Sequence, residues 1–390
     1  MCALSFIYGE NMQSIEILKK LISYPTITPK ECGIYDYIQE LLPNFKVLEF
    51  EKEGIKNLFL YKEFGDKDLA KTHLCFAGHI DVVPPGEGWE SDPFTPTQKG
   101  EYLYGRGTQD MKGGVAAFLC AVMEFEKQSN SQNAFNGILS ILLTSDEEGE
   151  AIYGTKYVLE ELDKIDLLPE FAIVAEPTSA ERFGDMIKIG RRGSINGKLT
   201  IFGKQGHVAY PSKCINPVEL IAPLLSKIAG FNIDNGNEDF EPSKIVITDI
   251  RGGMGVVNVT PNDLRIMFNI RNSTQTSLED LQSYLESILK EIPHSLELRQ
   301  SSKPFLTNTQ NFIVQKLVES LQKNTGFTSI LSTSGGTSDA RYFAEYGVNV
   351  VECGVCNDSI HSINEKVKIS EVESLSQVFL YLLQNFALKN

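Results

Sequence analysis

Apolar residues in the first half of the chain recur at two spacings that alternate from segment to segment. Residues 12–24 have the spacing of an amphipathic helix. A second helix is expected from Met111, because one face carries Val115, Phe118, Leu119, Val122 and Phe125. Runs of consecutive apolar residues at 72–79, 137–144 and 171–177 are typical of buried strands. Helices interleaved with such strands predict an α/β fold with a mainly parallel sheet flanked by helices.

The pattern changes between about Arg192 and Pro304, where strands that look antiparallel are interrupted by helices. Strands are expected at 195–204, 243–250 and 262–271, and helices at 216–230 and 277–292. Beyond Pro304 the α/β pattern resumes with a helix at 311–324, a strand at 347–353 and a helix from Ser370. A chain of 390 residues is also long enough for two domains. We therefore expect a discontinuous domain formed by 1–191 and 305–390, with a smaller α+β domain inserted at 192–304.

The charge balance limits the partners that the protein can have. The chain carries 36 Lys and Arg against 51 Asp and Glu, a net charge of −15. This excess of acid disfavours binding to nucleic acid or to an anionic membrane surface. An anionic substrate would need a local basic pocket.

The apolar runs and the cysteines of the sequence indicate the cellular compartment of the protein. No uninterrupted apolar run approaches the roughly 18 residues of a membrane span. The first residues lack a basic segment followed by a long apolar run, so no signal peptide is expected, and Met12 is an alternative start. The seven cysteines are scattered and odd in number, which favours reduced thiols over a disulfide framework. We expect a cytoplasmic protein.

Histidines and acids follow the ends of several expected strands. His79 ends one strand, Glu147 and Glu148 follow the next, and Glu176 follows a third. His361 comes soon after the strand at 347–353. Because the carboxyl ends of strands in an open α/β sheet form the ligand crevice, these side chains are expected to converge.

Asp110, in the glycine-rich turn GRGTQDMKGG, supplies a further carboxylate to this group. If one of the adjacent pair Glu147 and Glu148 stays free, two imidazoles and three carboxylates remain. This set suits zinc, and the number of ligands favours two ions if one carboxylate bridges them. Two-metal hydrolases use such a site to hold and activate water. Glu147 and Glu148 are adjacent and should point different ways, so one can bind metal while the other acts as base. Asp81 can accept the second N–H of His79.

Three other motifs leave alternatives open. CGVC, with Cys353 and Cys356, is either a pair of structural thiols or, less favoured, a redox pair or half of a zinc site. GKQGH places His207 at a strand end, where it is either a turn residue or a functional one. Arg191 and Arg192 in IGRRGS form either a carboxylate-binding pair or a basic surface pair.

Taken together, the motifs resemble those of a family of dinuclear zinc amidohydrolases that includes acetylornithine deacetylases, aminoacylases and carboxypeptidases. In chain order they are GHIDVVPPG, GRGTQDMKGG, TSDEEGEA, AEPTS, GRRGS, GHVAYP, NVTP, SGGTSDAR and SIH, from Gly78 to His361. The resemblance implies that His79 and Glu176 bind one zinc, Glu148 and His361 the other, and Asp110 both. It also implies that Glu147 is the general base and Asp81 orients His79. Cobalt is an alternative metal in one site.

The resemblance extends to substrate and assembly. It implies a small anionic N-acyl amino acid as substrate and a homodimer formed through the inserted domain. It further implies that His207 reaches the active site of the partner subunit and stabilises the oxyanion. By the same similarity, substrate carboxylates and backbone groups are held by Arg191, Tyr210, Asn258, Arg271, Gly336, Thr337 and Asn357.

Two kinds of alternative remain at this stage. Another N-acyl amino acid hydrolase, or a dipeptidase, would share every metal ligand and differ only around Arg191 and Asn258. A non-catalytic binding protein of the same fold would be expected to lack a ligand or the base. All six of those positions are intact in this sequence.

Overall fold

The computed structural model describes residues 4–65, 72–128 and 135–386, with side chains in the first helix described from residue 13. The chain divides into two compact units. The larger unit comprises Met1–Ile189, Thr307–Ser332 and Ser338–Asn390, and the smaller unit comprises Gly190–Leu306 and Thr333–Thr337. The divisions thus lie at 189/190 and 306/307, where the sequence suggested 191/192 and 304/305. The segment 333–337, which the sequence assigned to the larger domain, belongs to the smaller unit.

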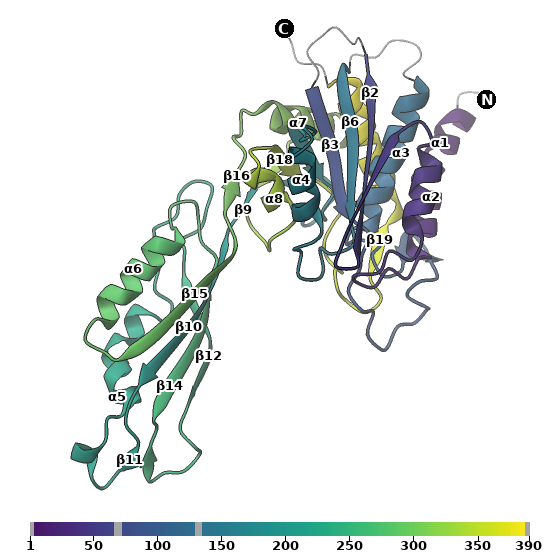
Figure 1. The fold of residues 1–390 in the computed structure, drawn as a ribbon. Coiled ribbons are helices and arrows are strands. Elements are labelled where there is room, and N and C mark those ends of the chain that lie inside the picture. Colours follow the sequence, from purple (N-terminus) through teal and green to yellow (C-terminus); the bar gives the residue numbers. More distant parts are fainter. Residues whose placement is uncertain (1–3, 66–71, 129–134, 387–390) are drawn as a thin grey trace. The chain divides into compact units, whose positions relative to one another are not determined.

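The larger unit is built on a mixed sheet of eight strands among the described residues (Figure 1). In spatial order they are β1 (Lys46–Lys52), β2 (Ile55–Phe64), β6 (Gly137–Thr144), β3 (Thr72–His79), β7 (Phe171–Val174), β18 (Asn349–Glu352), β8 (Met186–Lys188) and β17 (Ile330–Ser332). The central strands β6, β3, β7 and β18 are parallel to one another. The predicted α/β fold with a mainly parallel sheet is confirmed.

The central strands lie in the middle of the core. All eight residues of β3 and all four of β7 are buried, which explains why both read as unbroken apolar runs in the sequence. Aromatic side chains join the sheet to the helices, since the Phe76 ring lies 5.6 Å from that of Phe118 and 5.0 Å from that of Phe379. These contacts fix β3 against helices α3 (Lys112–Gln128) and α9 (Ile369–Gln384).

The helices of the larger unit pack on this sheet and on one another (Figure 1). They are α1 (Leu4–Ile22), α2 (Ile34–Leu41), α3 (Lys112–Gln128), α4 (Thr155–Asp163), α7 (Phe312–Thr325), α8 (Ala340–Glu345) and α9 (Ile369–Gln384). A separate small sheet joins β19 (Lys366–Lys368), β5 (Tyr102–Tyr104) and β4 (Thr97–Lys99). Among the described residues, no helix has both the length and the apolar character that crossing a membrane requires.

The smaller unit has its own sheet and its own core. Its antiparallel strands, in order, are β12 (Ile245–Gly252), β14 (Asp263–Ile270), β10 (Ser194–Phe202) and β15 (His294–Ser302). Short pairs are formed by β11 (Gly206–His207) with β13 (Val259–Thr260) and by β9 (Gly190–Arg191) with β16 (Phe305–Leu306). The helical elements are η1 (Pro211–Lys213), α5 (Pro217–Ile221), η2 (Ala222–Lys227) and α6 (Leu278–Leu289). Inward residues of the sheet, such as Leu199, Ile266 and Phe268, form one cluster with Leu281 and Leu285 of α6.

The structure corrects the expected extent of one helix and shows two elements, β15 and α2, that the sequence analysis did not predict. The helix expected at 216–230 ends as an α-helix at Ile221 and continues as a 3₁₀ turn that holds Pro223. Proline lacks the N–H that an α-helix needs at this position. Strand β15 alternates half-buried and exposed residues, a period-two signal that sequence reasoning missed. The short helix α2 was also missed, and its apolar face contains only Ile34, Tyr35 and Ile38 as buried residues.

His73, at the start of β3, makes the stability of the larger unit depend on pH. The ring is 7% exposed, with Nε2 2.8 Å from Ser140 Oγ. Burial lowers the pKa of His73 from 6.5 to about 4, against the opposing effect of a backbone hydrogen bond at Leu168. Between these two pH values the unfolded chain binds the proton and the folded chain does not. The contribution of neutral His73 to the free energy of unfolding is therefore fully present above pH 6.5, and it is lost as the pH falls towards 4.

We expect this group to lower the free energy of unfolding by about 2 kcal/mol between pH 7.5 and pH 5. Urea unfolding of the wild type and of His73→Gln at both pH values measures the effect. Glutamine does not titrate, so the variant should lose that part of the pH dependence. Equal pH dependence in the two proteins would contradict the expectation.

Candidate metal centre

The candidate site lies in the larger unit, at the carboxyl ends of the parallel strands. The register pairs His79, the last residue of β3, with Thr144 at the end of β6, and Ala77 of β3 with Val174 at the end of β7. The loops that leave these strands therefore begin side by side. Glu147 and Glu148 are on the loop after β6, and Glu176 follows β7 by two residues. The predicted convergence of strand ends supplies most of the candidate ligands.

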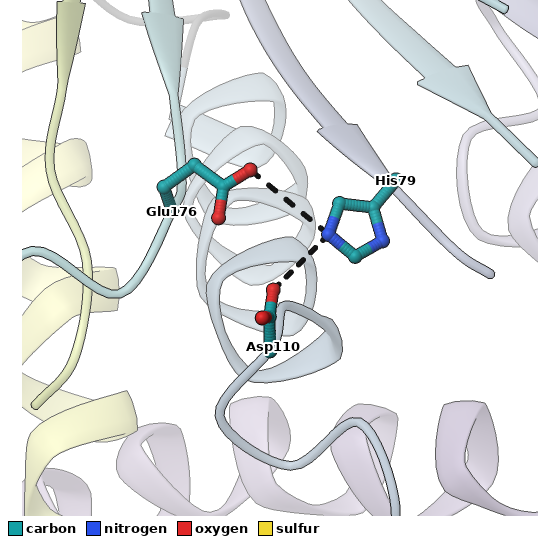
Figure 2. A group of neighbouring side chains, drawn as sticks. All are labelled: His79, Asp110 and Glu176. Atoms are coloured by element: carbon teal, nitrogen blue, oxygen red, sulfur yellow. Dashed lines mark hydrogen bonds and ion pairs between the residues drawn. The ribbon is translucent and has the colours of Figure 1, made fainter. Parts of the chain in front are cut away.

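The first group of candidate ligands is His79, Asp110 and Glu176 (Figure 2). His79 Nε2 lies 3.1 Å from Asp110 Oδ1 and 4.0 Å from Glu176 Oε1. His79 is 1% exposed, and the side chains of Asp110 and Glu176 are 12% and 10% exposed. Figure 2 shows both carboxylates directed at the same ring nitrogen. One nitrogen and two oxygens at this spacing match the donor set of a divalent cation such as zinc.

The second group is Asp110, Glu148 and His361. His361 Nε2 lies 2.8 Å from Glu148 Oε1 and 3.2 Å from Asp110 Oδ2. Asp110 thus presents one carboxylate oxygen to each histidine. The backbone of His361 has φ 57, in the left-handed region that non-glycine residues rarely adopt. Such a conformation is held in place by its surroundings and is typical of functional sites.

Glu147 stands beside both groups but differs from its neighbour Glu148. Its Oε2 is 4.0 Å from His79 Nε2, whereas Glu148 Oε1 accepts a hydrogen bond from His361 Nε2 at 2.8 Å. Burial raises the pKa of Glu147 well above its usual range, and the charges of Asp339, Asp110 and Glu148 add to this, against the opposing effect of His79. A carboxyl group with a raised pKa beside candidate metal ligands is suited to take up and release a proton.

The other acids of the segment SDEEGE have different positions. Asp146 Oδ2 accepts hydrogen bonds from the backbone N–H groups of Ile152 and Tyr153, at 2.9 and 3.1 Å, and so shapes the loop. Glu150 is exposed. Four acids follow the end of β6 in the sequence. Of these, only Glu147 and Glu148 lie in the candidate site.

Asp81 supports His79 in a way that differs from the prediction. The second ring nitrogen of His79, Nδ1, is 2.9 Å from the Asp81 backbone oxygen and 3.6 Å from carboxylate Oδ1. The hydrogen bond that fixes the ring is therefore made by the main chain. The Asp81 carboxylate instead accepts from Thr28 Oγ1 and from the Glu148 backbone N–H through Oδ2. It orders the loops on both sides of the site.

The acids of this site require positive charge. Burial raises the pKa of Glu176 well above its usual range, with further contributions from Asp110 and Glu147. Burial lowers the pKa of His79, but Asp110, Glu147 and Asp81 outweigh it and raise that pKa overall. Hydrogen bonds to Asp110 and Glu148 raise the pKa of His361 to about 10. The acids around both imidazoles therefore favour a bound positive charge, and the donor set fits divalent cations.

Asp339, which is buried, and Arg341, which is half-buried, carry no role in the sequence interpretation. Asp339 is 5% exposed, and burial raises the pKa of its carboxyl. Arg341 Nη2 donates to Tyr342 Oη, which in turn donates to the Ala151 carbonyl at 2.7 Å. This chain of contacts secures the loop that carries Glu147. The only signal in the sequence was the motif SGGTSDAR, which by itself assigns no role to either residue.

Three of the residues predicted to contact substrate or oxyanion cluster in the smaller unit. His207 in β11 pairs with Val259, and the Val208 N–H donates to the Asn258 carbonyl at 3.1 Å. The Tyr210 ring lies 6.1 Å from that of His207. All three predicted side chains, those of His207, Tyr210 and Asn258, are exposed. The structure brings them together.

The remaining predicted substrate residues are distributed over both units. Arg191 is 8% exposed and donates from Nη1 to the Ser334 carbonyl at 3.0 Å, within the segment that also holds Gly336 and Thr337. Asn357 belongs to the larger unit, where Nδ2 lies 3.5 Å from the Pro177 oxygen. Arg271 lines a hollow in the smaller unit with Arg192 and Lys244.

The cysteines in the described part of the chain are free thiols. Burial raises the pKa of Cys353 to about 12, so its sulfur is kept as an unreactive thiol. Cys356 is 8% exposed, and burial raises its pKa too. These findings support structural thiols in CGVC. Cys2 lies outside the described residues.

Fold and site together define a hydrolase of the metallopeptidase type. The profile of Peptidase family M20/M25/M40 matches residues 75–385, and the chain belongs to that family. A succinyl-diaminopimelate desuccinylase of Wolinella succinogenes is 60% identical over 369 residues, which cover 95% of this chain and 98% of that protein. The succinyl-diaminopimelate desuccinylase of Helicobacter hepaticus is 56% identical over 382 residues, covering 95% and 97%.

Solved structures agree on the fold. The aminopeptidase PepT of Bacillus cereus aligns with a TM-score of 0.79 at 19% identity, over 96% of this chain and 98% of that chain. A protein of Bacillus subtilis aligns with a TM-score of 0.70 at 14% identity, over 96% and 98%. The latter is described as a dinuclear metal-binding peptidase from the M20 family. At these identities the likeness concerns the fold alone.

Proposed function

We propose that this protein hydrolyses the amide bond of N-succinyl-L,L-2,6-diaminopimelate to succinate and L,L-2,6-diaminopimelate, a step in the synthesis of lysine and meso-diaminopimelate. The observation that carries the proposal is the 60% identity, over nearly the whole chain, to a succinyl-diaminopimelate desuccinylase. The intact set of candidate ligands and Glu147 supports catalysis rather than binding alone. A biosynthetic role of this kind is consistent with a cytoplasmic location.

Two divalent cations are part of the proposal. His79, Asp110 and Glu176 would hold one, and Asp110, Glu148 and His361 the other. Zinc is the metal that suits these ligands, with cobalt as an alternative in one site. When bound, the ions supply Lewis-acid polarisation of the amide carbonyl and a lowered pKa for water.

The side chains carry the proton transfers. Glu147 takes a proton from the attacking water, whose oxygen forms the new bond to the succinyl carbonyl carbon. When the C–N bond breaks, Glu147 returns this proton to the leaving amine. Burial raises the pKa of Glu147, which makes its carboxylate a stronger base for the first of these transfers. The products are succinate, which holds the oxygen from water, and the free amine of diaminopimelate.

The smaller unit has two roles in this proposal. It forms a homodimer, and its His207 donates a hydrogen bond to the oxyanion in the active site of the partner subunit. The exposure of His207, Tyr210 and Asn258 on one part of the smaller unit supports such a role. A preorganised donor of this kind is commonly worth about 3 to 4 kcal/mol of transition-state stabilisation.

Turnover of succinyl-diaminopimelate, with and without chelator, tests the function directly. We expect rapid hydrolysis, loss of activity in chelator and recovery with Zn²⁺ or Co²⁺. Faster hydrolysis of acetylornithine, of another acetylated amino acid or of a dipeptide would assign the enzyme to that activity instead. A purified protein with no bound metal and no amide hydrolysis would indicate a binding protein.

Substrate charge suggests a role for the basic hollow of the smaller unit. Arg192, Lys244 and Arg271 line a volume of about 430 Å³. Arg192 Nη1 is paired with Glu241 Oε2 at 2.9 Å. Burial lowers the pKa of Arg271, and the charge of Arg192 lowers it further. A carboxylate placed between these cations would relieve their repulsion, and the proposed substrate carries three carboxylates.

We expect Arg271→Ala to raise KM for the succinylated substrate by about tenfold to a hundredfold. This is the usual loss of affinity when one charge-assisted hydrogen bond is removed. Arg271→Lys should recover part of this loss. Arg251, on the same unit but 80% exposed and paired with Asp249, provides the control Arg251→Ala. Steady-state kinetics of the three variants decide the matter. Unchanged KM in Arg271→Ala would exclude a role in substrate binding.

A further inference from the structure

Glu365 is a fully buried carboxylate four residues after His361. Its Oε1 accepts from the backbone N–H groups of Gln109 and Asp110, at 2.8 and 3.2 Å. Its Oε2 accepts from the Gly107 N–H at 2.9 Å and from Arg106 Nη1 at 2.8 Å. Four donors from one short segment therefore converge on one side chain. That segment carries Asp110, the residue shared by both groups of candidate ligands.

Arg106 extends this arrangement to two other segments. Its guanidinium is 2% exposed and lies 5.2 Å from the ring of Trp89. The second terminal nitrogen, Nη2, donates to the Pro85 carbonyl at 3.3 Å and lies 3.5 Å from the His361 carbonyl. The pair of Arg106 and Glu365 thus contacts the loop after β3, the loop before α3 and the segment of His361. The first of these segments directly follows His79, and the other two hold Asp110 and His361.

A buried ion pair of this kind is not explained by stability alone. Removing two charges from water has a free-energy cost that their attraction offsets only when hydrogen bonds satisfy the remaining atoms. Here the hydrogen bonds are made with the backbone beside Asp110, so the pair specifies the conformation of that loop. In the described structure, the result is that Asp110 Oδ1 faces His79 and Oδ2 faces His361.

We propose that Glu365, together with Arg106, is a positioning pair that holds the loop 106–110 so that Asp110 can bridge two metal ions. The inference rests on the proposed two-metal site. Both side chains are buried, and their hydrogen bonds are made with each other and with backbone groups. Partners that orient a metal ligand in this way typically change metal affinity or activity by about 10-fold to 100-fold when they are replaced.

The test uses the full-length protein with Glu365→Gln and Arg106→Lys. Glutamine has one oxygen and one NH₂ group, so donors would face donors where Oε1 or Oε2 now accepts. Lysine keeps the charge of Arg106 but cannot contact Glu365, Pro85 and His361 together. Metal-free protein is titrated with Co²⁺, followed by visible absorption, and thermal unfolding is recorded in parallel.

The matched control is Asp234→Asn in the smaller unit. Asp234 also holds a loop through four donors, which are the N–H groups of Gly236 and Ser243 and the hydroxyls of Ser273 and Thr276. It contacts none of the candidate ligands. Its replacement should lower the melting temperature without changing the Co²⁺ affinity or spectrum.

We expect Glu365→Gln to weaken Co²⁺ binding by about 10-fold to 100-fold and to alter the spectrum. Its kcat should fall while KM changes by less than about twofold, because substrate contacts are retained. Arg106→Lys should give a smaller change of the same kind. If both variants bind two Co²⁺ ions with wild-type affinity and spectrum, the pair is merely structural and the inference is wrong. This comparison holds whichever amide the enzyme prefers, so it is independent of the substrate assigned above.

Discussion

Replacing Glu147 with glutamine is expected to lower kcat by about three to four orders of magnitude while both metal ions stay bound. The amide has nearly the shape of the carboxylate but cannot take a proton from water or return it to the amine. Glu147 Oε2 lies 4.0 Å from His79 Nε2. The contacts of Asp110 with His79 and with His361 do not involve Glu147, so both should remain in the variant. KM should change little. Single-turnover kinetics and metal analysis of the same preparation measure both parts of the expectation.

Glu150→Gln is the matched control for this experiment. Glu150 is an exposed acid on the same loop, three residues along the chain, and its replacement should leave kcat within about twofold of the wild type, as is usual for surface substitutions. A Glu147→Gln enzyme with substantial activity would exclude Glu147 as the base. Loss of metal from that variant would instead make Glu147 a ligand, since ligand atoms of Glu147, His79 and Glu148 also lie within 4.8 Å of one another.

The sheet and the principal site could be predicted from the sequence because both depend on strands buried on two faces. β3 and β6 read as continuous apolar runs, and their register places His79 opposite Thr144. Polar residues directly after such strands must emerge at one edge of the sheet. The local sequence pattern was therefore sufficient to predict that His79, Glu148 and Glu176 lie at the same edge of the sheet.

Other features could not be predicted because they depend on contacts between distant segments. Glu365 lies 255 residues from Asp110 in the chain, and nothing in the sequence around it indicates four converging donors. The hydrogen bond from His79 to the Asp81 backbone was likewise invisible, because every residue has a carbonyl. The segment 333–337 belongs to the smaller unit through tertiary contacts that sequence periodicity does not encode.

The substrate residues show a third limit. Resemblance to the family named Arg191, Tyr210, Asn258 and Arg271, but periodicity alone gives no reason to choose them from other polar residues. In the structure they occupy different surroundings, since Arg191 is buried against Ser334 and Arg271 lines a basic hollow. Their roles therefore stay predictions that kinetics must test, whereas the metal ligands are supported by their mutual distances.

Asp110→Asn is expected to damage the site more than replacement of any other single ligand. Each oxygen of Asp110 faces a different histidine, at 3.1 Å from His79 and 3.2 Å from His361. Asparagine keeps one oxygen, and its NH₂ group cannot bind a cation, so one of the two groups must lose a ligand. We expect the bound metal to fall from two ions to one or fewer. The loss of several kcal/mol of transition-state stabilisation should lower kcat by more than about a thousandfold.

Glu176→Gln provides the comparison, because Glu176 belongs to the group of His79 and not to that of His361. That variant should keep the ion held by Glu148 and His361 with nearly normal affinity. In Asp110→Asn, binding at both positions should weaken, since the shared carboxylate also balances the charge of each neighbouring ion. Titration of metal-free protein with Zn²⁺ or Co²⁺ separates the two patterns. Two tightly bound ions in Asp110→Asn would show that Asp110 does not bridge them, and the second ion would then need a ligand from elsewhere in the chain.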